Sequence, residues 1–203
     1  MIVDSTGQPL TRRRVSGIVL AGGRSSRFGR DKLAEPIDGR ALLLHAIDAV
    51  RPLVSEVLVV VGPGARPAVP PDVRIVHDAA PFEGPLAGLL AGLGAANELI
   101  VLVTAGDMPE LVAGVVEVLL TALNAPGTDV AVLGHGGQAL PLPMALRRDA
   151  GMAATAGLVE TGERRLRALI DALATTVIAE ATWRVLDPEG RTVRDIDTPA
   201  DLP

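Results

Sequence analysis

A glycine turn and a cluster of cations stand directly after the first apolar run of the chain. Gly22 and Gly23 follow the apolar residues 15–20. The basic side chains that come next are Arg24, Arg27, Arg30 and Lys32. Glycine lets a backbone approach phosphate oxygens closely with its N–H groups, and basic side chains offset the negative charge of those oxygens. The segment therefore predicts a loop that binds a triphosphate.

The spacing within this segment excludes two well-known phosphate loops. A P-loop requires Gly-Lys-Ser/Thr after a glycine and four further residues. Here Arg-Asp-Lys follows Gly29, and Leu33 stands where a magnesium-binding hydroxyl would be. The glycines also do not form the G-x-G-x-x-G pattern of dinucleotide-binding proteins. An ordinary strand-to-helix turn with a basic helix start is the remaining alternative, and the number of cations favours the phosphate loop over it.

Asp107 follows an apolar run at a position where open parallel sheets bind their ligands. The run spans residues 99–103, and Met108 and Pro109 then turn the chain toward the next element. Such ligands bind beyond the carboxyl ends of the strands, and Mg²⁺ prefers one or two carboxylates together with phosphate oxygens. Asp107 is therefore predicted to be a magnesium ligand, with a role as N-cap of the following helix as the alternative.

Three further aspartates follow apolar runs. Asp78 comes shortly after the run 73–76, and its carboxylate could accept both the ring N–H and the exocyclic amine of guanine, or cap a loop. Asp195 and Asp197 end the last run and could bring a second carboxylate to the metal, or be turn residues. Because no Ser-His-Asp order with a nucleophile elbow occurs, the predicted chemistry is transfer to a phosphorus centre, which requires positioning and charge stabilisation.

Apolar runs alternate with helical patterns along the chain. This order predicts an α/β fold of three layers, with a Rossmann-like, mostly parallel sheet covered on both faces. A run at 140–146 is expected at the edge of the sheet or with a bulge, because it contains Pro141 and Pro143. The other expected strands span 15–20, 57–61, 73–76, 99–103, 130–133, 184–186 and 192–196, and the expected helices span 41–50, 86–93, 109–123 and 160–173.

The composition limits the class of protein. The chain has 203 residues, of which 48% are hydrophobic, with a net charge of −5 and no cysteine. We expect one domain over residues 15–203 after a flexible leader over 1–14, without disulfides or cysteine metal sites. The acidic charge and the few aromatic residues argue against a nucleic-acid partner. Since neither a secretion signal nor a long apolar run is present, we expect a cytoplasmic protein with no membrane partner.

The segment Leu20 to Lys32, Leu-Ala-Gly-Gly-Arg-Ser-Ser-Arg-Phe-Gly-Arg-Asp-Lys, resembles the signature loop of the molybdenum cofactor guanylyltransferases. That family belongs to the nucleotidyltransferases with a glycosyltransferase-A-like fold. The resemblance covers nearly the whole chain after residue 14. The further matching segments are Gly39-Arg-Ala-Leu-Leu43, Gly84-Pro-Leu-Ala-Gly88, Gly106-Asp-Met-Pro109, Gly162-Glu-Arg-Arg165 and Asp197-Thr-Pro-Ala-Asp-Leu202.

The resemblance implies transfer of GMP from GTP to the phosphate of molybdopterin, with Mg²⁺ as cofactor and release of diphosphate. GTP and a molybdopterin-type acceptor are the implied partners, and carrier or acceptor enzymes of the molybdenum cofactor are further candidates. Lys32 would contact the phosphates, Asp78 would read guanine and Asp107 would hold the metal. Arg27 and Lys32 would stabilise charge on the departing diphosphate. The implied backbone contacts to the nucleotide come from Leu20, Ala21, Gly22 and Gly23.

Two alternative functions stay open from the sequence: a related nucleotidyltransferase that uses CTP or a sugar phosphate acceptor, and a non-catalytic nucleotide-binding regulator. The glycine pair 22–23 and the segment 84–88 favour guanine, since the related cytidylyltransferases usually have Ala-Ala-Gly in the loop and lack the later segment. Two features depart from the family pattern. Residues 59–64 lack the asparagine that often follows the second strand, and Asp195 and Asp197 stand where asparagine is frequent.

The position of the acceptor is also open. Residues 134–138, Gly-His-Gly-Gly-Gln, and the pair Arg147-Arg148 could line a pterin pocket. The alternative is that the first segment is a hairpin turn and the second the start of a helix, and this alternative is slightly favoured.

Overall fold

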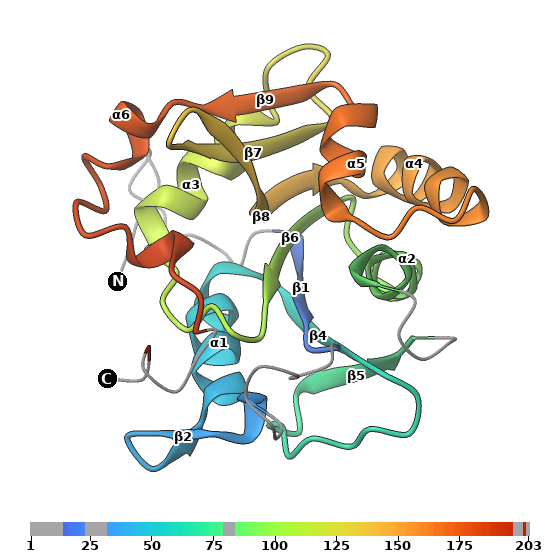
Figure 1. The fold of residues 1–203 in the computed structure, drawn as a ribbon, viewed down its shortest axis with the longest axis vertical. Coiled ribbons are helices and arrows are strands. Elements are labelled where there is room, and N and C mark those ends of the chain that lie inside the picture. Colours follow the sequence, from blue (N-terminus) through green and yellow to red (C-terminus); the bar gives the residue numbers. More distant parts are fainter. Residues whose placement is uncertain (1–13, 23–31, 79–83, 197–200, 202–203) are drawn as a thin grey trace.

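In the computed structural model of the protein, helices cover both faces of a mostly parallel β-sheet (Figure 1). Within the described residues, 14–22, 32–78, 84–196 and 201, seven strands pair in the order β5-β4-β1-β6-β8-β7-β9. β8 runs antiparallel to β6 and β7, whereas the other pairings of this sheet are parallel. The predicted fold class is confirmed. The strands are β1 (Val15–Leu20), β4 (Glu56–Val61), β5 (Val73–His77), β6 (Ile100–Ala105), β7 (Val130–His135), β8 (Gln138–Arg147) and β9 (Thr175–Ile178).

Helices on each face bury the sheet. On one face α1 (Leu42–Val50), α3 (Ala113–Ala122) and the tryptophan of α6 (Glu180–Trp183) pack against the strands. On the other face α2 (Pro85–Ala95), α4 (Arg148–Glu160) and α5 (Leu166–Ala172) do so. Strands covered on both faces are apolar along their length rather than alternating, which explains the apolar runs of β1, β4 and β6. Short 3₁₀ helices are η1 (Lys32–Ala34), η2 (Arg51–Leu53) and η3 (Arg191–Val193), and a small hairpin joins β2 (Pro36–Ile37) to β3 (Arg40–Ala41).

The run at 140–146 forms an inner strand, so the expectation of an edge position is wrong and the expectation of a bulge is confirmed. β8 lies between β6 and β7, and its ladder with β6 covers Met144 to Arg147. Its ladder with β7 shifts register between Val132 and Gly134. Pro141 and Pro143 therefore precede the ladder with β6 and lie where the pairing with β7 is irregular, so the missing N–H groups interrupt no regular pairing.

The predictions for the last third of the chain are partly wrong. Residues 160–173 do not form one helix, because α4 ends at Glu160, Gly162 adopts a positive φ of 82°, and α5 begins at Leu166. Residues 184–186 form a turn after α6, and 192–196 comprise the end of η3 and irregular backbone over 194–196, so neither is a strand. The parallel edge strand β9 and most of α4 were not predicted. The strands and helices expected over residues 15–133 are present with small shifts of their ends.

Two glycines of α2 test how closely this helix packs on the sheet. A Cβ on Gly92 would lie 3.0 Å from side-chain atoms of Ile18 and Val60, whereas a Cβ on Gly94 would meet nothing within 4 Å. We expect Gly92→Ala to lower the free energy of unfolding by about 1 kcal/mol, because crowding outweighs the gain in helix propensity. Gly94→Ala should raise it by about 0.5 kcal/mol. Urea unfolding of both variants checks this, and a shift in the same direction for both would contradict it.

Candidate active site

The carboxyl ends of β1, β4 and β6 lie at the same level, and the predicted binding segments begin there. Leu20, the last residue of β1, pairs with Val60 of β4 and Ala105 of β6. Hydrogen bonds continue past the strand ends, since the Ala21 N–H donates to the Val60 carbonyl at 2.7 Å and the Gly106 N–H donates to the Leu20 carbonyl at 2.9 Å. The strand order also reverses at β1, where open α/β sheets bind their ligands.

Lys32 and Asp107 form an ion pair at this edge. The Lys32 Nζ lies 2.5 Å from the Asp107 Oδ2, and the two side chains are 18% and 19% exposed. Gly106 permits this approach, because a Cβ there would lie 3.2 Å from side-chain atoms of Leu33 in η1 and of Leu43 in α1. The turn after β6 thus packs directly under η1. The result is one cation and one carboxylate, both mostly shielded from water, at the carboxyl edge of the sheet.

Asp78 lies on the other side of the β1 turn from Asp107. It follows β5, its N–H donates to the Val61 carbonyl at 2.9 Å, and its side chain is half-buried. A Cβ on Gly88 of α2 would lie 3.9 Å from the Asp78 Oδ2 and 4.0 Å from the Leu20 Cδ2. The glycine at 88 therefore leaves room beside a carboxylate and the end of β1. A ligand that spans from Asp78 to the Lys32–Asp107 pair would pass over Leu20, Ala21 and Gly22.

The start of α2 contacts the loop before α5. Gly84 has a φ of 84°, and a Cβ there would lie 2.8 Å from the Arg164 Cβ and 3.0 Å from its carbonyl oxygen. The carboxylate of Glu163 accepts hydrogen bonds from the Arg165 guanidinium and from the backbone N–H groups of Arg164 and Arg165. These bonds, foremost that from the Arg165 side chain, lower the pKa of Glu163 to about 2. Two segments that matched the family pattern in the sequence are thus in contact.

Most of the predicted site residues that the structure describes come together. Leu20, Ala21, Gly22, Lys32, Asp78 and Asp107 all lie at the carboxyl edge described above. Asp195 is brought near as well, since the N–H of its neighbour Ile196 donates to the Asp107 carbonyl at 2.9 Å. Among the described residues no group of three or more His, Cys, Asp or Glu could hold a metal ion. The predictions for Gly23, Arg24, Arg27, Arg30 and Asp197 fall outside the described residues.

The segment 134–138 forms the hairpin turn between β7 and β8. Gly136 and Gly137 both have positive φ, and the hairpin is held by α6, which the sequence patterns did not reveal. The Glu180 carboxylate accepts the Gly136 N–H at 2.9 Å and contacts the His135 Nδ1 at 2.8 Å. The Trp183 indole N–H donates to the Gly134 carbonyl at 2.8 Å.

Arg147 and Arg148 lie at the opposite edge of the sheet from this hairpin. β8 runs antiparallel to its neighbours, so its last residue, Arg147, stands where β7 begins. The Arg147 guanidinium donates to the carbonyls of Leu123 and Thr128, and the Arg148 guanidinium donates to that of Ala96. Arg147 is therefore the last residue of β8 and the N-cap of α4, and Arg148 begins this helix, in agreement with the expected helix start. Neither residue is part of a pocket at the carboxyl edge.

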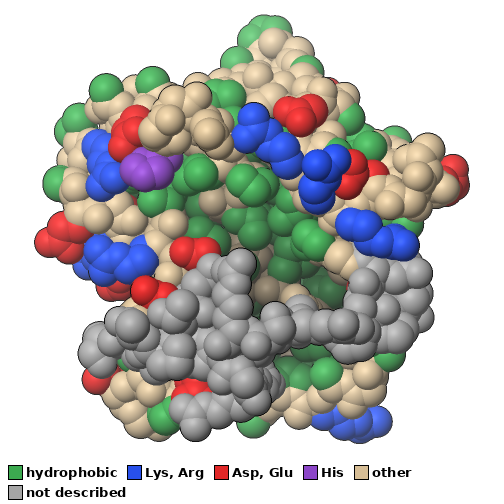
Figure 2. Space-filling view, in the orientation of Figure 1, with side chains coloured by type: hydrophobic (Ala, Val, Ile, Leu, Met, Phe, Trp, Pro, Cys, Tyr) green, Lys and Arg blue, Asp and Glu red, His purple; other side chains and the backbone are tan. Residues whose placement is uncertain are grey.

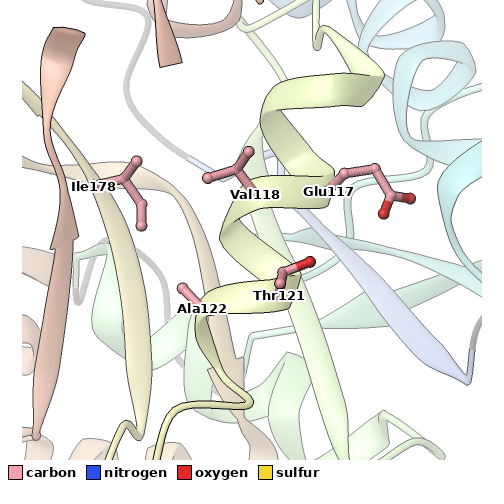
Figure 3. A pocket seen from close by; sticks show the side chains of 5 residues that line it. All are labelled: Glu117, Val118, Thr121, Ala122 and Ile178. Atoms are coloured by element: carbon pink, nitrogen blue, oxygen red, sulfur yellow. The ribbon is translucent and has the colours of Figure 1, made fainter. Parts of the chain in front are cut away.

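The surface provides two further observations. Figure 2 shows a hydrophobic hollow near the middle of one face, with basic side chains along part of its rim. A separate pocket between α3 and β9 is lined by Glu117, Val118, Thr121, Ala122 and Ile178 (Figure 3). None of the predicted site residues lines this pocket. No helix in the described part of the chain has both the length and the apolar character needed to cross a membrane.

Comparisons with known proteins identify the family of the chain and its fold. The family model for the MobA-like NTP transferase domain matches residues 17–177. A protein of Chloroflexus aggregans named "Probable molybdenum cofactor guanylyltransferase" is 38% identical over 197 residues, which cover 93% of this chain and 91% of that protein. A molybdenum cofactor guanylyltransferase of Burkholderia ambifaria is 38% identical over 165 residues, covering 76% and 80% of the two chains.

Two solved structures share the fold. The molybdopterin-guanine dinucleotide biosynthesis protein A of Archaeoglobus fulgidus superposes with a TM-score of 0.77 at 22% identity, over 92% of this chain and 94% of that one. The 2-C-methyl-D-erythritol 4-phosphate cytidylyltransferase of Thermus thermophilus superposes with a TM-score of 0.68 at 20% identity, over 91% and 94%. The same architecture therefore occurs in proteins named for different nucleotides.

Substitution of Gly84 tests the contact between α2 and the loop before α5. We expect Gly84→Ala to lower the free energy of unfolding by about 2–4 kcal/mol, because both the backbone conformation and the Arg164 backbone oppose a Cβ. Gly64→Ala is the matched control, since Gly64 has a φ of 77° with nothing within 4 Å of its Cβ position. The control should cost about 1–2 kcal/mol. Equal losses in urea unfolding would show that the Arg164 contact has no energetic weight.

Proposed function

Because the chain belongs to the family of MobA-like NTP transferases, we propose that it transfers GMP from GTP to the phosphate of molybdopterin and releases diphosphate. The observation that carries this proposal is the Lys32–Asp107 pair, which joins the start of η1 to the turn after β6, with Asp78 across the β1 turn. A cation and a metal-binding carboxylate at one end and a base-reading carboxylate at the other suit a nucleoside triphosphate. The names of the relatives support guanine as the base and the molybdenum cofactor as the product.

In the proposed reaction an oxygen of the molybdopterin phosphate attacks the α phosphorus of GTP. The new bond joins that oxygen to the α phosphorus, and the bond from the α phosphorus to the bridging oxygen of the β phosphate breaks. The electron pair leaves with diphosphate. Lys32 offsets the charge that develops on the leaving group, and we assign the same role to Arg27 in the loop after β1. No protein nucleophile is required.

Asp107 would hold Mg²⁺, and Asp195 or Asp197 would supply a second carboxylate. Carboxylate oxygens are the donors that Mg²⁺ prefers, so the donor set at this edge fits the ion. The contact between Ile196 and the Asp107 carbonyl brings the chain around Asp195 to the same turn. Bound Mg²⁺ would supply charge neutralisation on the phosphate oxygens. Lys32 balances the Asp107 charge in this structure.

The proposal also assigns separate surfaces to GTP and to the acceptor. The backbone of residues 20–22 would contact the nucleotide, and Asp78 would accept the two N–H donors of guanine. Gly88 leaves the space beside Asp78 that a base edge needs. The hydrophobic hollow with a partly basic rim in Figure 2 is a suitable surface for an acceptor that combines a flat heterocycle with a phosphate.

Removal of the Asp107 carboxylate tests the reaction and its metal dependence together. We expect Asp107→Asn to reduce kcat for GMP transfer by about 100-fold or more, because charge stabilisation at the phosphates is lost. Diphosphate release from GTP, CTP, ATP and UTP, with Mg²⁺ and molybdopterin, is the measurement. Asp149→Asn is the matched control, since Asp149 is 76% exposed and pairs with Arg148 at the opposite edge. Diphosphate release from CTP alone would overturn the assignment of guanine as the base. If none of the four nucleoside triphosphates releases diphosphate, the proposed function is contradicted.

A second variant tests the recognition of the base. Asp78→Asn keeps the shape of the side chain but replaces one acceptor oxygen with an amide NH₂ group, which is a donor. Guanine presents two donors at this edge, so only one of them keeps its acceptor. We expect kcat/KM for GTP to fall by about 10- to 100-fold, as for the loss of a hydrogen bond to a charged group. The wild-type preference for GTP over inosine triphosphate, which lacks the exocyclic amine, should shrink in the variant. An unchanged preference would place guanine recognition elsewhere.

A further inference from the structure

The segment that follows β9 connects the hairpin at residues 134–138 to the Asp107 turn. We call residues 180–196 the strap; they comprise α6, a turn and η3, drawn in orange-red to red in Figure 1. At its beginning Glu180 and Trp183 bind the hairpin through the hydrogen bonds given above. At its end the Ile196 N–H donates to the Asp107 carbonyl at 2.9 Å. The strap therefore reaches the residue that the proposed function makes the metal ligand.

The strap holds the loop 106–112 at both ends. This loop leads from β6 to α3 and forms neither helix nor strand. A backbone hydrogen bond from the Met108 N–H to the Ala105 carbonyl, at 3.2 Å, closes the turn at its start, and no helix or strand ladder fixes the rest. Ile196 holds the near end at Asp107, and the Thr192 Oγ1 accepts the N–H of Val112 at the far end, at 3.1 Å. Between them, the Arg194 guanidinium lies 3.8 Å from the Glu110 carboxylate. Two hydrogen bonds and an exposed ion pair thus set the path of the loop that carries Asp107.

Asp187 in turn fixes Thr192. Its carboxylate is 1% exposed and accepts the N–H groups of Arg191 at 3.0 Å and of Thr192 at 2.8 Å. Burial acts to raise the pKa of Asp187, but the hydrogen bonds from the Thr192 backbone and hydroxyl and from the Arg191 backbone lower it overall. Thr192 itself is fully buried. Its own N–H donates to the Asp187 carboxylate, while its Oγ1 accepts the Val112 N–H.

We propose that Asp187 and Thr192 are positioning residues for Asp107. This proposal rests on the proposed function, since it assumes that Asp107 binds the metal. Neither residue would touch the nucleotide or the ion. They act through the loop, by holding it so that the Asp107 carboxylate faces the ligand in one orientation. Groups of this kind around metal ligands commonly contribute about 10- to 100-fold to metal affinity.

The alternative is that the buried carboxylate only stabilises the fold, and conservative variants separate the two roles. Thr192→Val removes the acceptor for Val112 and keeps the side-chain volume, whereas Thr192→Ser keeps the hydroxyl. Asp187→Asn removes the negative charge and replaces one acceptor oxygen with the NH₂ group of an amide, which can only donate. The matched control is Thr128→Val, because Thr128 is also buried, at 5% exposed, and bonds the Thr176 hydroxyl at 2.9 Å near the opposite edge of the sheet. Thermal unfolding of each variant measures the purely structural cost.

The readout is the affinity for a GTP analogue with a methylene group between the α and β phosphorus atoms. Calorimetry gives its Kd in EDTA and again with Mn²⁺, and the ratio of the two values is the gain that the metal provides. We expect the gain to fall about tenfold in Thr192→Val and in Asp187→Asn, with an unchanged Kd in EDTA. Thr192→Ser and Thr128→Val should keep the wild-type gain, even where thermal unfolding shifts.

The outcomes separate this proposal from the proposed function. If Asp107→Asn abolishes the gain but Thr192→Val and Asp187→Asn keep it, the positioning role is overturned and the metal site stands. If the Kd in EDTA changes as much as the Kd with Mn²⁺, the two residues act on the fold as a whole and the proposal fails. If the wild-type protein shows no gain, Asp107 does not bind the metal, and both proposals are overturned.

Discussion

The pairing of β1 with both β4 and β6 is the constraint on which the candidate site depends. A strand that is buried on both faces has no polar face to fix its register. Close contacts with the helices provide that restraint instead. A Cβ on Gly17 of β1 would lie 2.6 Å from the Val50 Cγ1 of α1, and Gly92 of α2 packs against Ile18 on the opposite face. Because β1 is held in one register, the turns after three strands begin at one level, and Lys32, Asp78 and Asp107 can share a ligand.

The half of the sheet that carries the candidate site could be predicted from sequence because its strands are continuous apolar runs with clear turns between them. The rest of the chain lacks such signals for physical reasons. α4 buries little beyond Gly151 and Thr155, so it has no apolar stripe. β9 is an edge strand that begins with two threonines and is only partly buried. The helix expected over 160–173 contains a break, because Gly162 in a left-handed conformation follows the end of α4 and α5 begins only at Leu166.

The candidate site was predictable where residue type alone implies chemistry. The Lys32–Asp107 pair joins residues far apart in the sequence. Lys32 was predicted as a cation of the phosphate loop, and Asp107 because it follows a strand end in a parallel sheet. The strap could not be found in this way. Its contacts to the loop 106–112 are made by a backbone N–H and a threonine hydroxyl, which leave no pattern in a sequence. Asp187 gives no signal either, because an aspartate before Pro188 is typical of an ordinary turn.

Because the chain carries a net negative charge, the binding of a triphosphate would depend on how charged side chains are arranged within the site. With a net charge of −5 the protein as a whole repels such an anion. At physiological salt, however, charges more than about 8 Å apart are largely screened. What matters is therefore the balance within the site, where the Asp107 carboxylate is already matched by Lys32. Nearby acidic groups are matched too, since Glu163 binds Arg165 and Glu180 binds His135 and Arg184. An acidic protein can thus have a site for a polyanion, because these carboxylates are each paired with a basic side chain.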